Sequence, residues 1–420
     1  MSTPPARHIT IPKGFYAAAT TCGLKESGWP DLALILSDRQ CSTAGVFSTS
    51  RTPGAPLIVS KRHLRGGRAW GVIVNSGNAN DCTGDQGVRD AKEMCRLVAA
   101  NLPHAGVPAL QSSGIDAGDV LVGSTGIIGR LLDMEKVTAG VETLLPRLAR
   151  GREADAAAAR AILTTDLTLK TARRRFTLDG QTVNLGGIAK GSGMIAPNMG
   201  TMLAYITTDA AITATMLQRA LRDACAASFN RISVDQHTSP SDMVLVFANG
   251  AAGNASINDG GEAYNAFADA LTDLCRDLAY QVVKDGEGAT RVFRVRITGA
   301  RSEREADRVA QAIVNSPLVK TAVHGADANW GRIVTAAGYS GVALRPTKLS
   351  LHIGADNPIC VFAQGMPTAL RRAELRRLAT LMRKKEVTFQ LELGRGAAQV
   401  EWLGCDLSRE YVTINADYTT

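Results

Sequence analysis

The chain has 420 residues, of which 45% are hydrophobic and 20% charged, a composition typical of globular proteins with two or three domains. Its net charge is +8, but only 5% of its residues are aromatic, which argues against the basic and aromatic stripe of a nucleic-acid binder. No stretch approaches the roughly 20 apolar residues of a membrane span, and the first residues form no apolar signal segment, so we expect a cytoplasmic protein.

The first half of the chain alternates apolar runs with amphipathic segments. Strands are predicted at 32–36, 55–60 and 69–75, and helices at 87–102, near 134–149 and at 153–163. Residues 174–190 predict a strand pair, because Asp179 and Gly180 suit a two-residue hairpin turn.

The second half continues the alternation. Strands are predicted at 202–208, 242–250, 291–300, 348–353, 387–393 and 410–414, and helices at 216–228, near 260–282 and at 302–316. Residues 370–386 predict an exposed basic helix. Because the strands are rich in hairpin signals, we expect layered α+β architecture rather than a doubly wound sheet.

The eight cysteines are scattered without CxxC pairs or a histidine cluster, which argues against a zinc site and a disulfide framework. We therefore expect no metal. His237 is the only histidine near a cluster of acidic and hydroxyl residues, and a lone histidine of this kind is more often a surface or packing residue than a base. It receives no catalytic role.

Two glycine-rich segments have both a structural and a functional interpretation. VLVGSTGIIG (120–129) lacks the spacing of a nucleotide-binding loop and can be a tight strand-to-helix turn. Alternatively, Thr125 and Gly126 offer hydroxyl and backbone N–H donors to a developing oxyanion. VNSGNANDCTGDQG (74–87) carries three asparagines, which can satisfy loop backbone or contact a polar substrate.

The segment KGSGMIAPNMGTMLAYITTDA (190–210) joins a turn-forming half to an apolar, β-branched half at Gly200–Thr201. A threonine hydroxyl is a weak nucleophile without a base. If the Gly200–Thr201 bond is cleaved, the new α-amine of Thr201 can act as that base, with an ordinary pKa of about 8. The structural alternative is a simple turn at the start of a strand.

Several segments occur together in an order that resembles one family. They are VNSGNANDCTG, GSTGIIG, TTD, GIAKGSGMIAPNMGTML, KDGEGA, NSPLVKTAVHGADANWGRI and CDLSREYVTINADYTT. The chain resembles the glutamate N-acetyltransferases (ornithine acetyltransferases, the ArgJ family) over essentially its whole length. The resemblance implies a layered α+β fold of the DmpA/ArgJ type, with hairpin-rich sheets, flanking helices and autoprocessing into two chains.

The family resemblance implies an activity. Members cut themselves before a threonine, and the freed threonine takes an acetyl group from N-acetylornithine and passes it to glutamate by ping-pong covalent catalysis in arginine biosynthesis. No cofactor is implied, although some members also accept acetyl-CoA as a donor. Two copies of each fragment, a heterotetramer, are the implied assembly. The implied chains are 1–200 and 201–420, with a smaller subdomain from about 290.

The resemblance also implies roles for individual residues. Gly200–Thr201 is the implied cleavage site, with Thr201 the nucleophile, and Thr125 and Gly126 resemble the oxyanion pair. Lys190 matches a substrate lysine whose cation would pair with an α-carboxylate, and Glu287 matches a glutamate that could pair with an ammonium. The remaining implied substrate contacts are Thr165, Asn415 and Thr420.

Some positions depart from the family pattern. Gly200 stands where alanine is usual, a small change that should permit cleavage. In SVDQHTSPSDMV (233–244), where the family reads close to VDGDTSTNDTV, five residues differ: Gln236, His237, Pro240, Ser241 and Met243. These departures bear on substrate preference more than on cleavage.

Two other functions remain as alternatives. An aminopeptidase or amidase could use the same N-terminal threonine, because related folds host that chemistry and a fold does not set a function. An inactive small-molecule-binding module is the third hypothesis. Lys190, Glu287, Asn415 and Thr420 favour acetyl transfer, and the intact nucleophile and oxyanion motifs argue against the inactive module.

Overall fold

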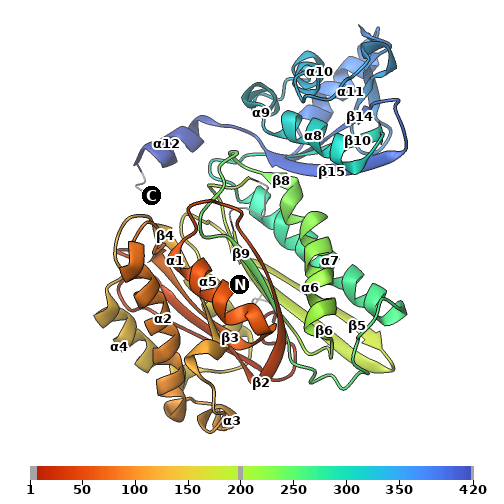
Figure 1. The fold of residues 1–420 in the computed structure, drawn as a ribbon. Coiled ribbons are helices and arrows are strands. Elements are labelled where there is room, and N and C mark those ends of the chain that lie inside the picture. Colours follow the sequence, from red (N-terminus) through yellow and green to blue (C-terminus); the bar gives the residue numbers. More distant parts are fainter. Residues whose placement is uncertain (1–6, 197–201, 418–420) are drawn as a thin grey trace.

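A computed structural model describes residues 7–196 and 202–417, which form two β-sheets with flanking helices (Figure 1). The strands of the first sheet are β1 (Phe15–Thr20), β2 (Leu32–Phe47), β3 (Arg68–Asn78), β4 (Val120–Ile127), β5 (Lys170–Leu178), β6 (Gln181–Lys190), β7 (Leu203–Thr208) and β9 (Met243–Ala248). Their order is β4-β3-β2-β9-β7-β6-β5, with β1 paired to β2.

The long strand β2 joins the two halves of this sheet. Its first residues pair with β1 and β3, a register shift separates Leu36 from Cys41, and residues 42–47 pair with β9. The pairs β3–β4 and β7–β9 are parallel, and the other pairs in the sheet are antiparallel. An apolar core lies between the halves, where Tyr205 and Phe247 meet residues of β2 and β3.

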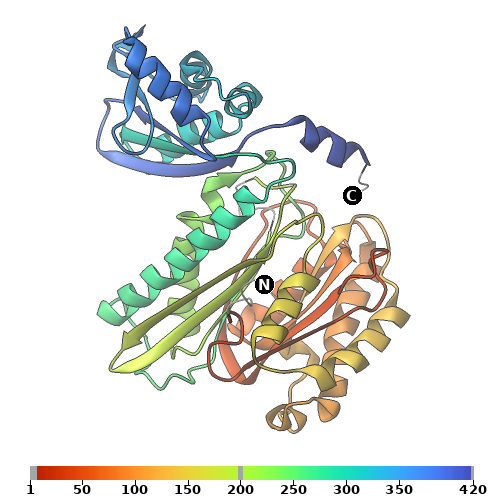
Figure 2. The same cartoon turned by 180° about the vertical axis from the view of Figure 1, so that it is seen from behind.

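Helices flank the first sheet (Figures 1 and 2). Its flanking helices are α1 (Ala55–His63), α2 (Gly84–Asn101), α3 (Pro108–Gln111), α4 (Met134–Leu144), α5 (Arg152–Ala161), α6 (Ala214–Ala226) and α7 (Glu262–Lys284). The helix α5 packs against the core between the two halves of the sheet. One buried cluster packs α6 and α7 on β5, β6, β7 and β9, and a second packs α2 and α4 on β1 to β4. Among the described residues, no helix combines the length and the apolarity needed to cross a bilayer.

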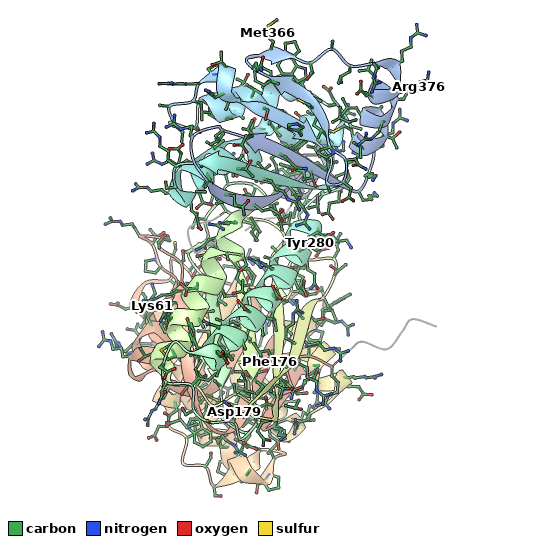
Figure 3. The ribbon with its side chains drawn as sticks, turned by 90° about the vertical axis from the view of Figure 1, so that its right-hand side faces the viewer. Lys61, Phe176, Asp179, Tyr280, Met366 and Arg376 are labelled. Carbon is green, nitrogen blue, oxygen red and sulfur yellow. The ribbon has the colours of Figure 1, made fainter. Side chains whose placement is uncertain are left out.

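The second sheet has its own apolar core and lies beyond the ends of α6 and α7 (Figure 1). The strands of this sheet are β8 (Ile232–Ser233), β10 (Val292–Ala300), β11 (Ser350–Ile353), β12 (Ile359–Ala363), β13 (Met366–Pro367), β14 (Glu386–Glu392) and β15 (Ala398–Cys405). The helices in this part of the chain are α8 (Glu303–Val314), α9 (Pro317–His324), α10 (Trp330–Gly338) and α11 (Arg372–Met382). Tyr280 on α7 lies where the two parts meet (Figure 3), and its hydroxyl donates to Glu386 at 3.1 Å.

The α+β expectation is confirmed, because each of the two sheets contains both antiparallel and parallel strand pairs. The hairpin of residues 174–190 forms as β5 and β6. Asp179 and Gly180 both have positive φ, 50° and 73°, as a two-residue turn between twisted strands requires. This turn sets the register of β6 and so places Lys190 at the end of that strand.

Two strand predictions were wrong. Residues 55–60 belong to α1: Gly54 precedes it, Pro56 lies in its first turn, and three basic residues in its last turn favour a helix over the β-branched run. Residues 410–414 belong to α12 (Arg409–Asp417), a helix with no buried residues. Its β-branched residues suggested a strand, but α12 is positioned by polar side chains, as described below.

The packing of β2 against β3 generates a test. A Cβ added to Gly71 would lie 2.0 Å from the carbonyl oxygen of Ile35 on β2, whereas one added to Gly118 would meet nothing within 4 Å. We expect Gly71→Ala to lower the free energy of unfolding by at least about 1–3 kcal/mol, because the backbones of β2 and β3 must move apart to admit the methyl group. Gly118→Ala is the matched control. Equal denaturation midpoints for both variants would contradict this packing.

Candidate active site

A cavity of about 220 Å³ lies where the ends of several distant segments meet. Its wall includes residues from β4, from the loop between α5 and β5, from the end of β6, from the start of β7, from the loop before β9, from the turn after α7 and from α12. The cavity therefore depends on the first sheet for its base and on α12 for part of its rim.

The structure brings most of the sequence-predicted site residues to this one cavity. The described members of that set that line it are Thr125, Gly126, Thr165, Lys190, Glu287 and Asn415. Gly200, Thr201 and Thr420 lie outside the described residues. Met194 and Met202 both line the cavity, so the described chain reaches it from both sides of residues 197–201.

Thr125 and Gly126 lie inside β4, not in a turn that leads to a helix, because β4 continues to Ile127. Gly126 has a φ of 131°, and a Cβ there would lie 2.4–2.6 Å from the backbone of Gly77 and Asn78 on β3. The parallel pairing of β3 and β4 shifts register at this point. Close strand approach is therefore one physical reason for the glycine, and its position on the cavity wall is compatible with the oxyanion interpretation.

Lys190 supplies a cation to the cavity wall. Its Nζ donates to Thr164 Oγ1 at 2.7 Å and to Thr125 Oγ1 at 3.3 Å, and lies 3.8 Å from a carboxylate oxygen of Asp166. Burial lowers the pKa of Lys190, and the charge of Asp166 opposes that effect. A carboxylate entering the cavity would find a largely desolvated ammonium as partner.

Glu287 supplies an anion that three segments hold in place. Its carboxylate accepts from Thr165 Oγ1 at 2.7 Å and from Asn415 Nδ2 at 2.8 Å, and its backbone N–H donates to the carbonyl of Ser192 at 2.9 Å. A Cβ on Gly193 would lie 2.3–2.6 Å from this carboxylate, so the glycine makes room for it. With Lys190 and Glu287 on its wall, the cavity presents both charges that a zwitterionic amino acid needs.

Asp235 was not predicted as a site residue, yet it connects three segments at the cavity. Its carboxylate accepts from the backbone N–H groups of Met194 and Ile195 at 2.6 and 2.8 Å and from the hydroxyl of Tyr411 at 3.4 Å. Burial raises the pKa of Asp235 against the effect of its backbone hydrogen bonds. Through Tyr411, this aspartate holds α12 next to the chain that precedes residue 197.

The loop that departs from the family pattern forms part of the cavity wall. His237 and Ser241, two of its five differing residues, line the cavity, and Pro240 accepts a hydrogen bond from the backbone of Gly54 at 3.1 Å. Gln236 has a positive φ of 67° and donates to the carbonyl of Asn315. The departures at His237 and Ser241 therefore fall where a substrate would make contact.

Asp81 is a second cavity residue that the sequence did not single out. One of its oxygens accepts from Ser241 Oγ at 2.5 Å, and the other is buried against Gly54 with no hydrogen-bond partner among the described residues. Burial raises the pKa of Asp81 to about 6, and the Ser241 hydrogen bond opposes this shift. Asn80 has a positive φ of 51°, so the Asn-rich segment turns sharply just before Asp81.

Comparisons with known proteins agree on one family. The model of the ArgJ family matches residues 16–420. The arginine biosynthesis bifunctional protein ArgJ of Symbiobacterium thermophilum is 44% identical over 414 residues, covering 98% of each chain. The protein of the same name from Geobacillus kaustophilus is 45% identical over 417 residues, covering 98% of this chain and 96% of its own.

Two solved structures are also similar. The crystal structure of the arginine biosynthesis bifunctional protein ArgJ from Bacillus halodurans is 41% identical, with a TM-score of 0.47, and the match covers 50% of this chain and 97% of that one. The ornithine acetyltransferase of Mycobacterium tuberculosis, solved in complex with ornithine, is 34% identical, with a TM-score of 0.40 and coverage of 46% and 95%.

The buried carboxyl of Asp81 predicts a pH dependence of stability. Its folded pKa of about 6 lies above its ordinary value of 3.8, so ionisation costs stability as pH rises from about 4 to about 6. Asp81→Asn removes this cost and keeps an oxygen for Ser241. We expect the variant to gain up to about 3 kcal/mol relative to wild type between pH ~4 and pH ~8 in denaturant unfolding.

The exposed Asp356 offers the control substitution Asp356→Asn. A stability difference between wild type and Asp81→Asn that is the same at both pH values would show that the carboxyl of Asp81 does not titrate as its burial requires.

Proposed function

This chain belongs to the ArgJ family, and we propose that it is an acetyltransferase of arginine biosynthesis that moves an acetyl group from N-acetylornithine to glutamate. The relatives matched over 98% of the chain share the name arginine biosynthesis bifunctional protein, which supports this activity. We place the enzyme in the cytoplasm, as two copies of each of two fragments, and it needs neither a metal nor a cofactor.

The observation that carries the proposal is the presence of both Lys190 and Glu287 on the wall of one cavity. The donor and the acceptor are both α-amino acids with an α-carboxylate, so one cation can bind each of them in turn. A carboxylate anchored at Lys190 would hold the acetamide of the donor, and later the amine of the acceptor, at one place. This is the requirement of a ping-pong transfer through one acyl-enzyme.

Thr201 is the proposed nucleophile, and it first makes its own base. Its hydroxyl adds to the carbonyl of Gly200, the C–N bond breaks as the hydroxyl proton moves to the leaving amine, and water hydrolyses the resulting ester. The products are fragments 1–200 and 201–420. The new α-amine and the hydroxyl that it must deprotonate then belong to the same residue, Thr201.

Acetyl transfer follows in two steps of opposite direction. The hydroxyl of Thr201 attacks the acetyl carbonyl of N-acetylornithine, and the α-amine of Thr201 carries the proton to the departing ornithine amine. The free amine of glutamate then attacks the acetyl ester and regenerates the hydroxyl. Thr125 and Gly126 are the proposed donors to the oxyanion in both steps. Acetyl-CoA is the proposed second donor, in keeping with the word bifunctional in the relatives' names.

Cleavage at Gly200–Thr201 can be tested on the purified protein. Wild-type protein is expected to separate under denaturing conditions into two fragments whose masses match 1–200 and 201–420. Thr201→Ala is expected to remain a single chain, because the attacking hydroxyl is absent. Thr380→Ala, a change on the exposed side of α11, is the control and should be cut like wild type. A wild-type chain that stays whole in intact-mass analysis would contradict the mechanism.

The products of the reaction separate acetyl transfer from hydrolysis. With N-acetylornithine and glutamate, we expect N-acetylglutamate to form with parallel double-reciprocal plots, and little free acetate. Free acetate without N-acetylglutamate would instead favour the aminopeptidase or amidase alternative. A parallel reaction with acetyl-CoA in place of N-acetylornithine tests the second donor.

A further inference from the structure

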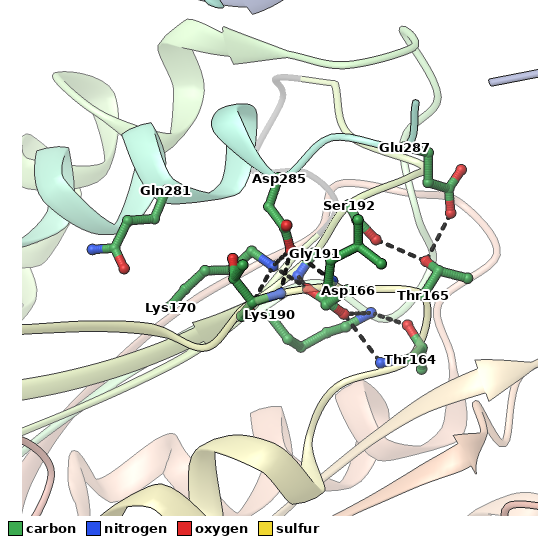
Figure 4. A network of polar contacts seen from close by, with 12 residues as sticks. Thr164, Thr165, Asp166, Lys170, Lys190, Gly191, Ser192, Gln281, Asp285 and Glu287 are labelled. Carbon is green, nitrogen blue, oxygen red and sulfur yellow. Dashed lines mark hydrogen bonds and ion pairs between the residues drawn. The ribbon is translucent and has the colours of Figure 1, made fainter. Parts of the chain in front are cut away.

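Behind the cavity wall, four charged side chains form a buried cluster (Figure 4). Lys170 at the start of β5 is fully buried, and its Nζ donates to Asp166 at 2.6 Å and to Asp285 at 2.5 Å. Asp166 also lies 3.8 Å from Lys190 Nζ. One aspartate is thus shared by two lysines, and a second aspartate completes a cluster with no net formal charge.

Both aspartates also fix the backbone of the loop between α5 and β5. Asp285 accepts from the N–H groups of Leu167 and Thr168 at 3.0 and 3.1 Å. Asp166 accepts from the N–H groups of Thr164 and Gly191 at 3.0 and 2.7 Å. The cluster therefore ties this loop to the end of α7 on one side and to the end of β6 on the other.

The loop carries two residues that contact the cavity charges directly. Thr164 accepts a hydrogen bond from Lys190, and Thr165 donates one to Glu287 at 2.7 Å (Figure 4). Asp285 stands two residues before Glu287 in the same turn after α7. Any shift of Lys170 or Asp285 would move the partners of both cavity charges. Neither residue is part of the described cavity wall, so both act through others.

We propose that Lys170 and Asp285 are positioning residues that hold Lys190 in place and keep its positive charge available for the substrate carboxylate. The proposal rests on the acetyl-transfer function described above. Because Lys170 also pairs with the carboxylate of Asp166, only part of that negative charge is available to neutralise Lys190. Without Lys170, the whole charge of Asp166 would be left to Lys190, and the ammonium of Lys190 would be less available to an α-carboxylate.

The charges around Lys190 set the direction of the expected pH effects. It faces the carboxylates of Asp166, Asp242 and Glu287 and the ammonium groups of Lys170 and Lys25. The positive charge of Lys170 lowers the pKa of Lys190. Its removal should raise that pKa while weakening carboxylate binding. Asp285→Asn should do the reverse to the pKa, since Lys170 would then pair with Asp166 alone.

The experiment compares Lys170→Met, Lys170→Arg and Asp285→Asn with the control Lys320→Met. Lys320 is the matched control because it is also a buried lysine, bonded to Cys405 in the second part of the molecule. Steady-state kinetics give KM and kcat for glutamate and N-acetylornithine, and calorimetry gives the affinity for glutamate without turnover. The alkaline limb of the pH profile of kcat/KM for N-acetylornithine reports changes in the pKa of Lys190.

Lys170→Met is expected to raise KM for both amino acids and the dissociation constant for glutamate about tenfold or more, with a smaller effect on kcat. The alkaline limb of the kcat/KM profile should move to higher pH in Lys170→Met and to lower pH in Asp285→Asn. Lys170→Arg should recover most of the affinity for glutamate because it keeps the positive charge. Lys320→Met should lose stability and change neither KM nor the limb.

Unchanged KM and affinity in folded Lys170→Met, or limbs that move in the same direction in the Lys170 and Asp285 variants, would overturn the inference. If Lys170→Met fails to fold, Lys170→Arg and Asp285→Asn decide the case by the same readouts. Absence of N-acetylglutamate formation by wild type would contradict the proposed function instead, and glutamate affinity would still test the positioning role.

Discussion

Asp166 is shared between two buried lysines, and the rest of the cavity depends on how this sharing is balanced. An unpaired buried charge is costly, so each member of the cluster must keep its partner. Lys170 and Asp285 satisfy one another and leave part of the charge of Asp166 to Lys190. Since the same carboxylates accept the N–H groups of residues 164, 167, 168 and 191, charge balance and backbone position are fixed together.

A second constraint connects the cavity to the far end of the chain. The helix α12 buries no apolar residue, so apolar packing contributes little to holding it. Instead Tyr411 and Asn415 bind Asp235 and Glu287, two carboxylates that belong to different segments, the first between β8 and β9 and the second between α7 and β10. A helix held by polar contacts with the cavity can respond to what the cavity contains. The departures at His237 and Ser241 lie on the same wall, next to these contacts.

Local sequence signals predicted much of the fold and part of the site. The Asp179–Gly180 turn defined its hairpin because only a few residue pairs adopt that conformation. The strand predictions at 55–60 and 410–414 failed because β-branched residues favour strands locally, whereas Pro56 in the first turn starts α1 and polar tertiary contacts position α12. The family resemblance singled out Lys190 and Glu287, and both line the cavity. It did not reveal Lys170 or Asp285, whose mutual contact spans 115 positions and leaves no periodic pattern.

The central claim is that Thr201 carries the acetyl group between two amino acids bound at one cation. The most direct test is mass spectrometry of the processed enzyme after incubation with N-acetylornithine alone. The account predicts that the 201–420 fragment gains the mass of one acetyl group, located on Thr201, and that added glutamate removes it as N-acetylglutamate. An unmodified Thr201, or an acetyl group that glutamate does not remove, would contradict the account.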